Sequence, residues 1–348
     1  MKTIDFDYHL PKDLIAQFPS EKRDECRLLY LDRANRSMEH RSFNDLPDLL
    51  RAGDRLIFNN TKVLHARVLC RKDSGAHVEL LFTECINNYS WKALARPAKN
   101  ARKGLSLSVE KAPSLRLHID SVLPEGTRII SLDNHFSPTV NTIEEIMQHF
   151  GEMPLPHYIK RKPQESDNNS YQTIFAREPG AIAAPTAGLH FTEQLLHRLE
   201  EKGISASFLT LHVGIGTFRP VLADDPRDHQ MHEEHFFLSP DAVSEISKTR
   251  QNGGRIIAVG TTVVRALEHC SLKAGFPIAG SGMTRLMIVP GFTFNAIDGI
   301  ITNFHVPRST LLMLVCAFAG GDFVFEAYRQ AIHERYRFYS YGDAMLII

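Results

Sequence analysis

The sequence has few of the features that mark secreted or metal-binding proteins. Its 348 residues include five cysteines, at positions 26, 70, 85, 270 and 316, which form no CxxC pair. An odd number of cysteines without metal-ligand spacing is typical of reduced thiols, so we expect a cytoplasmic protein. The first seven residues carry two acids and no apolar core, so we expect no signal peptide.

Long apolar runs and net charge are also lacking. The longest run, Leu311 to Ala319, is far shorter than the ~20 residues of a membrane-spanning helix, so we expect no membrane contact. Lys and Arg total 40, as do Asp and Glu, which leaves no net charge. Any affinity for nucleic acid must therefore come from a local basic cluster. With 43% apolar and 23% charged residues, the chain has the composition of a globular protein.

Signatures of several enzyme classes are missing or incomplete. There is no GxSxG elbow and no Walker loop. Gly214 to Gly216 begins a dinucleotide fingerprint, but Arg219 stands at the third glycine position, so we reject a Rossmann cofactor site. The segment from His232 to His235 is one residue short of the HExxH zinc signature. We interpret it as a polar loop and expect no metal and no redox cofactor.

The region from 63 to 140 is rich in short β-type runs. Turn-forming residues separate these runs, and no helical period appears between them. The runs are 66–69, 77–82, 91–95, 105–109, 115–119 and 128–132. Regular short strands of this kind predict a small β-barrel. Because mixed sequence lies on both sides, we predict an inserted domain at 63–140.

The remainder of the chain alternates between strand and helix patterns. Predicted strands cover 27–31, 55–58, 208–213, 255–259 and the C-terminal 344–348, and predicted helices cover 142–150, 240–251, 262–273 and 309–318. A further helix should begin after the capping residue Thr192. The helix predicted at 309–318 is apolar on every side and should be buried. We predict a mixed α/β main domain at 1–62 and 141–348, with 153–170 as a surface loop.

Four segments place glycine, threonine or histidine just after predicted strands. They are 183–191, 211–218, 260–262 and 302–307, and they include His190, His212 and His305. Free backbone N–H groups near a helix start suit an anionic or polar ligand, and ligands bind beyond the carboxyl ends of strands in open α/β sheets. A single histidine in such a turn is usually structural. Four such turns in one domain favour a binding site.

Basic residues gather in two loops of this neutral chain. The candidates for nucleic-acid contact, including two near the start of the insertion, are Lys62, Arg67, Arg96, Lys99, Arg102, Lys160 and Arg161. Either loop alone would be interpreted as solvated charge. Cations next to Tyr158, however, would suit a phosphate backbone with an unpaired base nearby.

Several long motifs resemble one family. They lie at 59–63, 153–156, 158–161, 171–173, 183–192, 211–220, 302–305 and 336–345. Together they are similar to the S-adenosylmethionine:tRNA ribosyltransferase-isomerase family of queuosine biosynthesis, nearly from end to end. The resemblance implies an α/β domain with an inserted β-barrel. It also implies transfer and isomerisation of the ribosyl group of S-adenosylmethionine onto 7-aminomethyl-7-deazaguanine at the tRNA wobble position. The product would be epoxyqueuosine-tRNA, with adenine and methionine released.

The resemblance gives the turns a ligand and a chemistry. S-adenosylmethionine, as co-substrate, would contact the residues Pro185, Thr186, Gly188, Gly214, Gly216, Thr217, Thr261, Thr262 and Asn303. The sulfonium acidifies the ribose 5′ hydrogens, and adenine leaves more easily once protonated. Histidine can serve either step, so His190, His212 and His305 are the catalytic candidates, without individual roles.

Two other functions remain open at this point. A nucleic-acid-binding module without catalysis would use the barrel and its basic loops, but would not explain the histidines in the α/β turns. An S-adenosylmethionine methyltransferase would need a glycine-rich first turn, which is missing. We expect a monomer whose partners are tRNA and S-adenosylmethionine.

Overall fold

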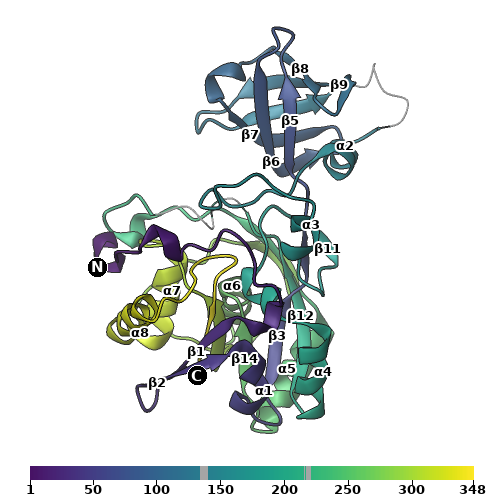
Figure 1. Ribbon diagram of the computed structural model, residues 1–348. Coiled ribbons are helices and arrows are strands. Elements are labelled where there is room, and N and C mark those ends of the chain that lie inside the picture. Colours follow the sequence, from purple (N-terminus) through teal and green to yellow (C-terminus); the bar gives the residue numbers. More distant parts are fainter. Residues whose placement is uncertain (134–139, 215, 217–220) are drawn as a thin grey trace.

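A nine-stranded mixed sheet forms the centre of the larger domain (Figure 1). The computed structural model describes residues 1–133, 140–214, 216 and 221–348. From one edge to the other the strands are β15 (Gly280–Thr284), β13 (Glu234–Leu238), β12 (Ser205–Leu211), β3 (Arg55–Asn59), β14 (Ile256–Val259), β16 (Gly299–Asn303), β17 (Ala344–Ile347), β1 (Arg27–Asp32) and β2 (Ser37–Ser42). The predicted mixed α/β class is confirmed.

The centre of this sheet is parallel. Strands β12, β3, β14 and β16 pair with one another in the same direction, so their carboxyl ends lie at one edge of the sheet. All four residues of β14 are buried apolar residues, as expected of a strand covered on both faces. The turns that follow β12, β14 and β16 are three of the four turns predicted to bind a ligand.

Helices cover both faces of the sheet, and alternate side chains of β3 show this. Ile57 joins a core with α5 (Pro240–Gln251), α6 (Thr261–Ser271), α7 (Thr310–Ala319) and α8 (Gly321–His333). Leu56 and Phe58 face the opposite way and pack with α1 (Leu46–Leu49) and α4 (Glu193–Glu201). Figure 1 shows α7 and α8 on one side of the domain and α4 on the other.

The predicted helices are confirmed, and their starts follow capping chemistry. The hydroxyls of Thr192, Ser239 and Ser309 accept hydrogen bonds from the third backbone N–H of α4, α5 and α7. Helix α7 is buried along nearly its whole length, as its apolar sequence predicts. No single helix in the described ranges is long and apolar enough to cross a membrane. Only α7 and α8 together reach that length, and they are bent by 114° at their junction.

The smaller domain is a closed antiparallel barrel of six strands at residues 67–132. Its strands are β5 (Arg67–Arg71), β6 (His77–Asn87), β7 (Ser90–Arg96), β8 (Ser106–Val109), β9 (Ala112–Val122) and β10 (Arg128–Leu132). Each corresponds to one of the predicted β-type runs, so the inserted barrel is confirmed. Buried residues alternate along the strands, as in β7, and fill the interior.

The barrel is joined to the larger domain by short backbone pairings. Strand β4 (Thr61–Val63) pairs in parallel with β11 (Glu178–Ala181), and Arg67 bridges to Glu152. Helix α2 (Ile143–Phe150) contributes Ile143, Ile146 and Met147 to the barrel's hydrophobic cluster. The predicted limits at 62/63 and 140/141 stay a prediction.

Two local expectations differ from the structure, and one long helix was not expected. The stretch 153–170 is not simply a surface loop, because Met153, Leu155 and Tyr158 are buried in the main core. The segment around Glu234, interpreted as a polar loop, contains the start of β13, whose alternate residues are buried. Helix α8 was not predicted. In each case burial against another part of the chain decides the structure, and the local sequence does not show that burial.

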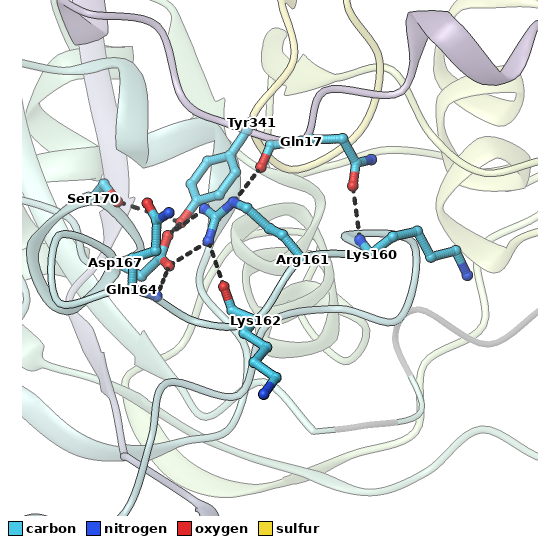
Figure 2. Close-up of polar contacts among 8 residues, drawn as sticks. All are labelled: Gln17, Lys160, Arg161, Lys162, Gln164, Asp167, Ser170 and Tyr341. Atoms are coloured by element: carbon cyan, nitrogen blue, oxygen red, sulfur yellow. Dashed lines mark hydrogen bonds and ion pairs between the residues drawn. The ribbon is translucent and has the colours of Figure 1, made fainter.

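Arg161 fixes the loop that follows α2 (Figure 2). Its two terminal nitrogens lie 2.6 and 2.7 Å from the Asp167 carboxylate, and its Nε donates to the carbonyl oxygen of Gln17 at 2.8 Å. Tyr341 also donates to Asp167, at 2.8 Å, and so ties the C-terminal segment to the same carboxylate. The backbone N–H of Lys160 donates to Gln17 Oε1 at 2.7 Å, whereas the Lys160 side chain extends away from this network in Figure 2.

We predict that Asp167→Asn lowers the free energy of unfolding by about 3 kcal/mol at pH 7, because Arg161 loses its buried counter-charge. Burial alone would raise the pKa of Asp167, but hydrogen bonds from Arg161, the Gln164 N–H and Tyr341 hold it below its ordinary value. The carboxylate therefore stabilises the fold above a pH of about 4, and this advantage declines as the pH falls through the lowered pKa. Urea unfolding at several pH values measures it.

The matched control is Asp48→Asn, since Asp48 forms an exposed ion pair with Lys202. That variant should unfold like the wild type. Equal stability of both variants at pH 7 would contradict the anchoring role of Asp167.

Candidate functional site

Two neighbouring cavities open at the carboxyl edge of the parallel strands. The smaller, which we name the inner pocket, has a volume of about 40 Å³. Its walls include Pro185, Thr186, Thr261, Thr262, Asn303 and His305. The larger, the outer pocket, has a volume of about 990 Å³ and is bounded by His212, Gly214 and His235 with barrel residues such as Trp91. Val213 lines both, so the two pockets adjoin at that residue.

The predicted ligand-binding residues are divided between these pockets. Five of them border the inner pocket, together with the catalytic candidate His305, and Gly214 borders the outer one. Gly188 and His190 lie in the short helix η6 (Thr186–His190) behind the inner pocket. Gly216 lies so close to His232 that a Cβ at residue 216 would stand 2.1 Å from its ring. Thr217 lies outside the described residues. The predicted turns therefore meet at one edge but form two compartments.

His190 reaches the inner pocket only through Asn303. Its Nε2 lies 3.0 Å from Asn303 Nδ2, and its Nδ1 lies 3.1 Å from Cys26 Sγ. Asn303 Oδ1 in turn accepts the Thr186 hydroxyl at 2.8 Å. Since the amide nitrogen can only donate, Nε2 accepts and the ring proton is on Nδ1. Burial lowers the pKa of His190 to about 4, so the ring is neutral near pH 7.

His305 is also neutral, and it contacts its neighbours through one ring nitrogen and through its backbone. Its Nε2 lies 2.8 Å from Thr302 Oγ1, and its backbone N–H donates to Tyr328 at 2.8 Å. Burial lowers the pKa of this histidine to about 3. A group of this kind shapes the wall of the inner pocket and does not carry charge there at neutral pH.

His212 is the predicted catalytic histidine that borders the outer pocket. Its Nδ1 lies 2.8 Å from Thr61 Oγ1, and its ring stacks on His235 with centroids 5.8 Å apart. Burial, and to a lesser degree His235, lowers the pKa of His212, whereas Glu178 acts in the opposite direction. Gly180 makes room for the ring, since a Cβ at residue 180 would come within 2.8 Å of it.

A buried ion pair that the sequence did not reveal links the two pockets. Glu234 of β13 pairs with Arg265 of α6, and both side chains are at least 96% buried, with exposures of 3% and 4%. Glu234 also accepts the backbone N–H of Gly214 at 3.1 Å. The pair therefore fixes the turn after β12 against the helix that begins at Thr261. The antiparallel pairing of β13 with β12 brings residue 234 beside this turn.

The predicted nucleic-acid contacts differ in their exposure. The exposed members of the set are Lys62, Arg96, Lys99, Arg102 and Lys160. Arg67 lies 3.8 Å from Glu79 and donates to the carbonyl of Leu155, and Arg161 is held by Asp167. Tyr158 is buried with its hydroxyl 2.6 Å from Ser340 Oγ, so it does not offer a face for base stacking.

Metal-ligating side chains do not converge in the part of the chain that the structure describes. No group of three or more His, Cys, Asp or Glu there could hold a metal ion. The histidines at 229, 232 and 235 border the outer pocket together, but as neighbours of a large open space.

Comparison with known proteins assigns the chain to a family. The family model described as queuosine biosynthesis protein matches residues 3–347. A protein of Moorella thermoacetica named S-adenosylmethionine:tRNA ribosyltransferase-isomerase is 48% identical over 349 residues, and one of Symbiobacterium thermophilum with the same name is 46% identical over 352. Both alignments cover 100% of each chain.

A solved structure agrees with this assignment. The crystal structure of S-adenosylmethionine tRNA ribosyltransferase from Thermotoga maritima is 36% identical, with a TM-score of 0.56, and the match covers 99% of this chain and 100% of that one. The chain therefore belongs to the queuosine biosynthesis protein family of S-adenosylmethionine:tRNA ribosyltransferase-isomerases.

Proposed function

We propose that this protein transfers and isomerises the ribosyl group of S-adenosylmethionine onto 7-aminomethyl-7-deazaguanine at the wobble position of tRNA. The products are epoxyqueuosine-tRNA, adenine and methionine. The observation that carries the proposal is the full-length match to relatives with this name, in a chain whose predicted site residues border two adjoining pockets. The sulfonium serves as both the acidifying group and the leaving group, so the reaction draws on no metal and no redox cofactor.

S-adenosylmethionine lies across the boundary between the two pockets in this proposal. The outer pocket, at about 990 Å³, has the size of a nucleoside or cofactor site, whereas the inner pocket of about 40 Å³ admits only a small group. The modified base of tRNA enters the outer pocket from the side of the barrel. A single chain supplies both pockets, and we propose that it acts as a monomer in the cytoplasm.

In this proposal, His212 removes a proton from the 5′ carbon of the ribose. Thr61 lies 3.5 Å from the Glu178 carbonyl, to which its hydroxyl can donate while it accepts the Nδ1–H of His212. This tautomer leaves a lone pair on Nε2. The lowered pKa of His212 keeps the ring unprotonated at neutral pH, as a base requires.

His190 and His305 act by positioning. Their ring nitrogens contact Asn303 and Thr302, and their pKa values of about 4 and 3 keep them neutral. His190 fixes the Asn303 amide, which then orients the Thr186 hydroxyl at the pocket wall. The exposed cations Arg96, Lys99, Arg102 and Lys160 supply the phosphate contacts to tRNA.

We predict that incubation with S-adenosylmethionine and precursor tRNA releases adenine and methionine in equal amounts, because both leave the same ribosyl group. Liquid chromatography of the products measures them. Formation of S-adenosylhomocysteine would instead indicate a methyltransferase. Tight tRNA binding with no small product would indicate a binding module.

We predict that His212→Gln lowers kcat at least ~10²-fold, the lower end of general acid–base effects. The wild-type rate should fall on the acid side with a midpoint below about 6.5, because the pKa of His212 is lowered from its ordinary value. Rates of adenine release from pH 5 to 8 measure both effects. His197→Gln, on the exposed face of α4, is the control. A wild-type rate for His212→Gln would contradict the assignment.

We predict that Lys160→Ala reduces the log–log salt slope of tRNA binding by ~0.7–0.9, the effect of one lost phosphate contact. Arg161→Ala should leave that slope nearly unchanged, because the Arg161 guanidinium is already paired with the Asp167 carboxylate. Binding titrations at several salt concentrations measure the slopes, with Lys248→Ala, an exposed residue of α5, as the control. Identical slopes for Lys160→Ala and Lys248→Ala would show that the loop carries only solvated charge.

A further inference from the structure

The inner pocket offers hydrogen-bond donors to an anion, although no Lys or Arg is among the described residues that border it. We propose that it binds the carboxylate of the methionyl group of S-adenosylmethionine, with α6 and Thr262 as its donors. The inference rests on the proposed function and assigns which end of that substrate enters this pocket.

Two helix N-termini meet at the inner pocket. Helix α6 begins at Thr261, and helix α7 begins after its capping residue Ser309, and both residues border the pocket. The first N–H groups of a helix have no acceptor within the helix, and each N-terminus carries roughly half a positive charge. Among the described residues, no acceptor is found for the backbone N–H groups of Thr261 and Thr262. These groups are free to bind an anion.

The Thr262 hydroxyl is a second and independent sign of a ligand. Thr262 borders the pocket and is 5% exposed, yet its Oγ1 has no hydrogen-bond partner among the described residues. This oxygen lies 3.6 Å from where a Cβ at Gly260, which also borders the pocket, would stand. A buried hydroxyl without a partner costs free energy, so such a group points to a partner that arrives from outside.

Two pairs of polar side chains in the pocket already contact each other. Thr186 donates to Asn303, and Thr302 lies 2.8 Å from His305 Nε2. No Asp, Glu, Lys or Arg is among the described residues that border the pocket. A carboxylate therefore meets hydrogen-bond donors and helix dipoles, with no like charge to repel it.

The volume of the inner pocket determines which end of S-adenosylmethionine it can hold. A cavity of about 40 Å³ holds a carboxylate in place of a few water molecules, but it is too small for an adenine ring. The adjoining outer pocket has the room for the adenosyl part. Since Val213 lines both pockets, the sulfonium and ribose lie near this residue, within reach of His212.

The test replaces the free hydroxyl by a methyl group of the same shape in Thr262→Val. The readout is kcat/KM for adenine release at saturating tRNA, with S-adenosylmethionine and with its decarboxylated form, S-adenosyl-3-methylthiopropylamine. The wild type should prefer S-adenosylmethionine by more than ~10-fold, because charge-assisted hydrogen bonds are lost with the carboxylate. Thr262→Val should lose about 10-fold of this preference, with its Tm unchanged or raised.

Thr173→Val is the matched control. Its hydroxyl is likewise buried without a partner among the described residues, but it borders a different cavity. This variant should keep the wild-type preference. An unchanged preference in Thr262→Val, or a wild type that uses both substrates equally, would overturn the carboxylate site. Absence of adenine from the wild type with S-adenosylmethionine would instead overturn the proposed function.

A second measurement needs no variant. L-Methionine should inhibit adenine release by the wild type at least about 10-fold more tightly than L-methioninamide, because only the former carries the carboxylate. Equal inhibition by the two compounds would overturn the proposal even if Thr262→Val does not fold.

Discussion

Four parallel strands, β12, β3, β14 and β16, end at one edge of the sheet, and both pockets depend on that alignment. The hydrogen-bond ladder places the turns after residues 211, 259 and 303 side by side, although they are far apart in the sequence. The buried Glu234–Arg265 pair then holds one turn against the helix that follows another. Removing either charge would leave the other buried without this counter-charge, so the geometry of the site and the stability of the fold both depend on this contact.

Burial lowers the pKa of all three histidines of the site, but their surroundings differ. Burial lowers the pKa of His190 and His305 far enough that they serve as fixed hydrogen-bonding groups in the pocket wall. His212 is less buried and borders the larger pocket, where a substrate can reach it. Among the described residues, no Lys or Arg borders the inner pocket. The exposed cations Arg96, Lys99, Arg102 and Lys160 border neither pocket, and we propose that they contact tRNA.

Much of the architecture could be predicted from local sequence. The spacing of apolar residues and the positions of turn and capping residues depend directly on the backbone conformation. The six barrel strands and helices such as α5 followed from alternation, capping residues and turn signals. The division of the turns into two pockets could not be predicted, since it depends on strand order. Tyr158 and Arg161 show the same limit. Both resembled nucleic-acid contacts in the sequence, but one packs against Ser340 and the other pairs with Asp167.

In the proposed complex, S-adenosylmethionine spans the two pockets and its ribose lies beside His212. A crystal structure of the protein with S-adenosylmethionine tests this most directly. We expect the methionyl carboxylate at the N-terminus of α6, within hydrogen-bond distance of Thr262, and the adenine ring in the outer pocket. A structure with the adenine ring in the inner pocket, or with the ribose remote from His212, would contradict it.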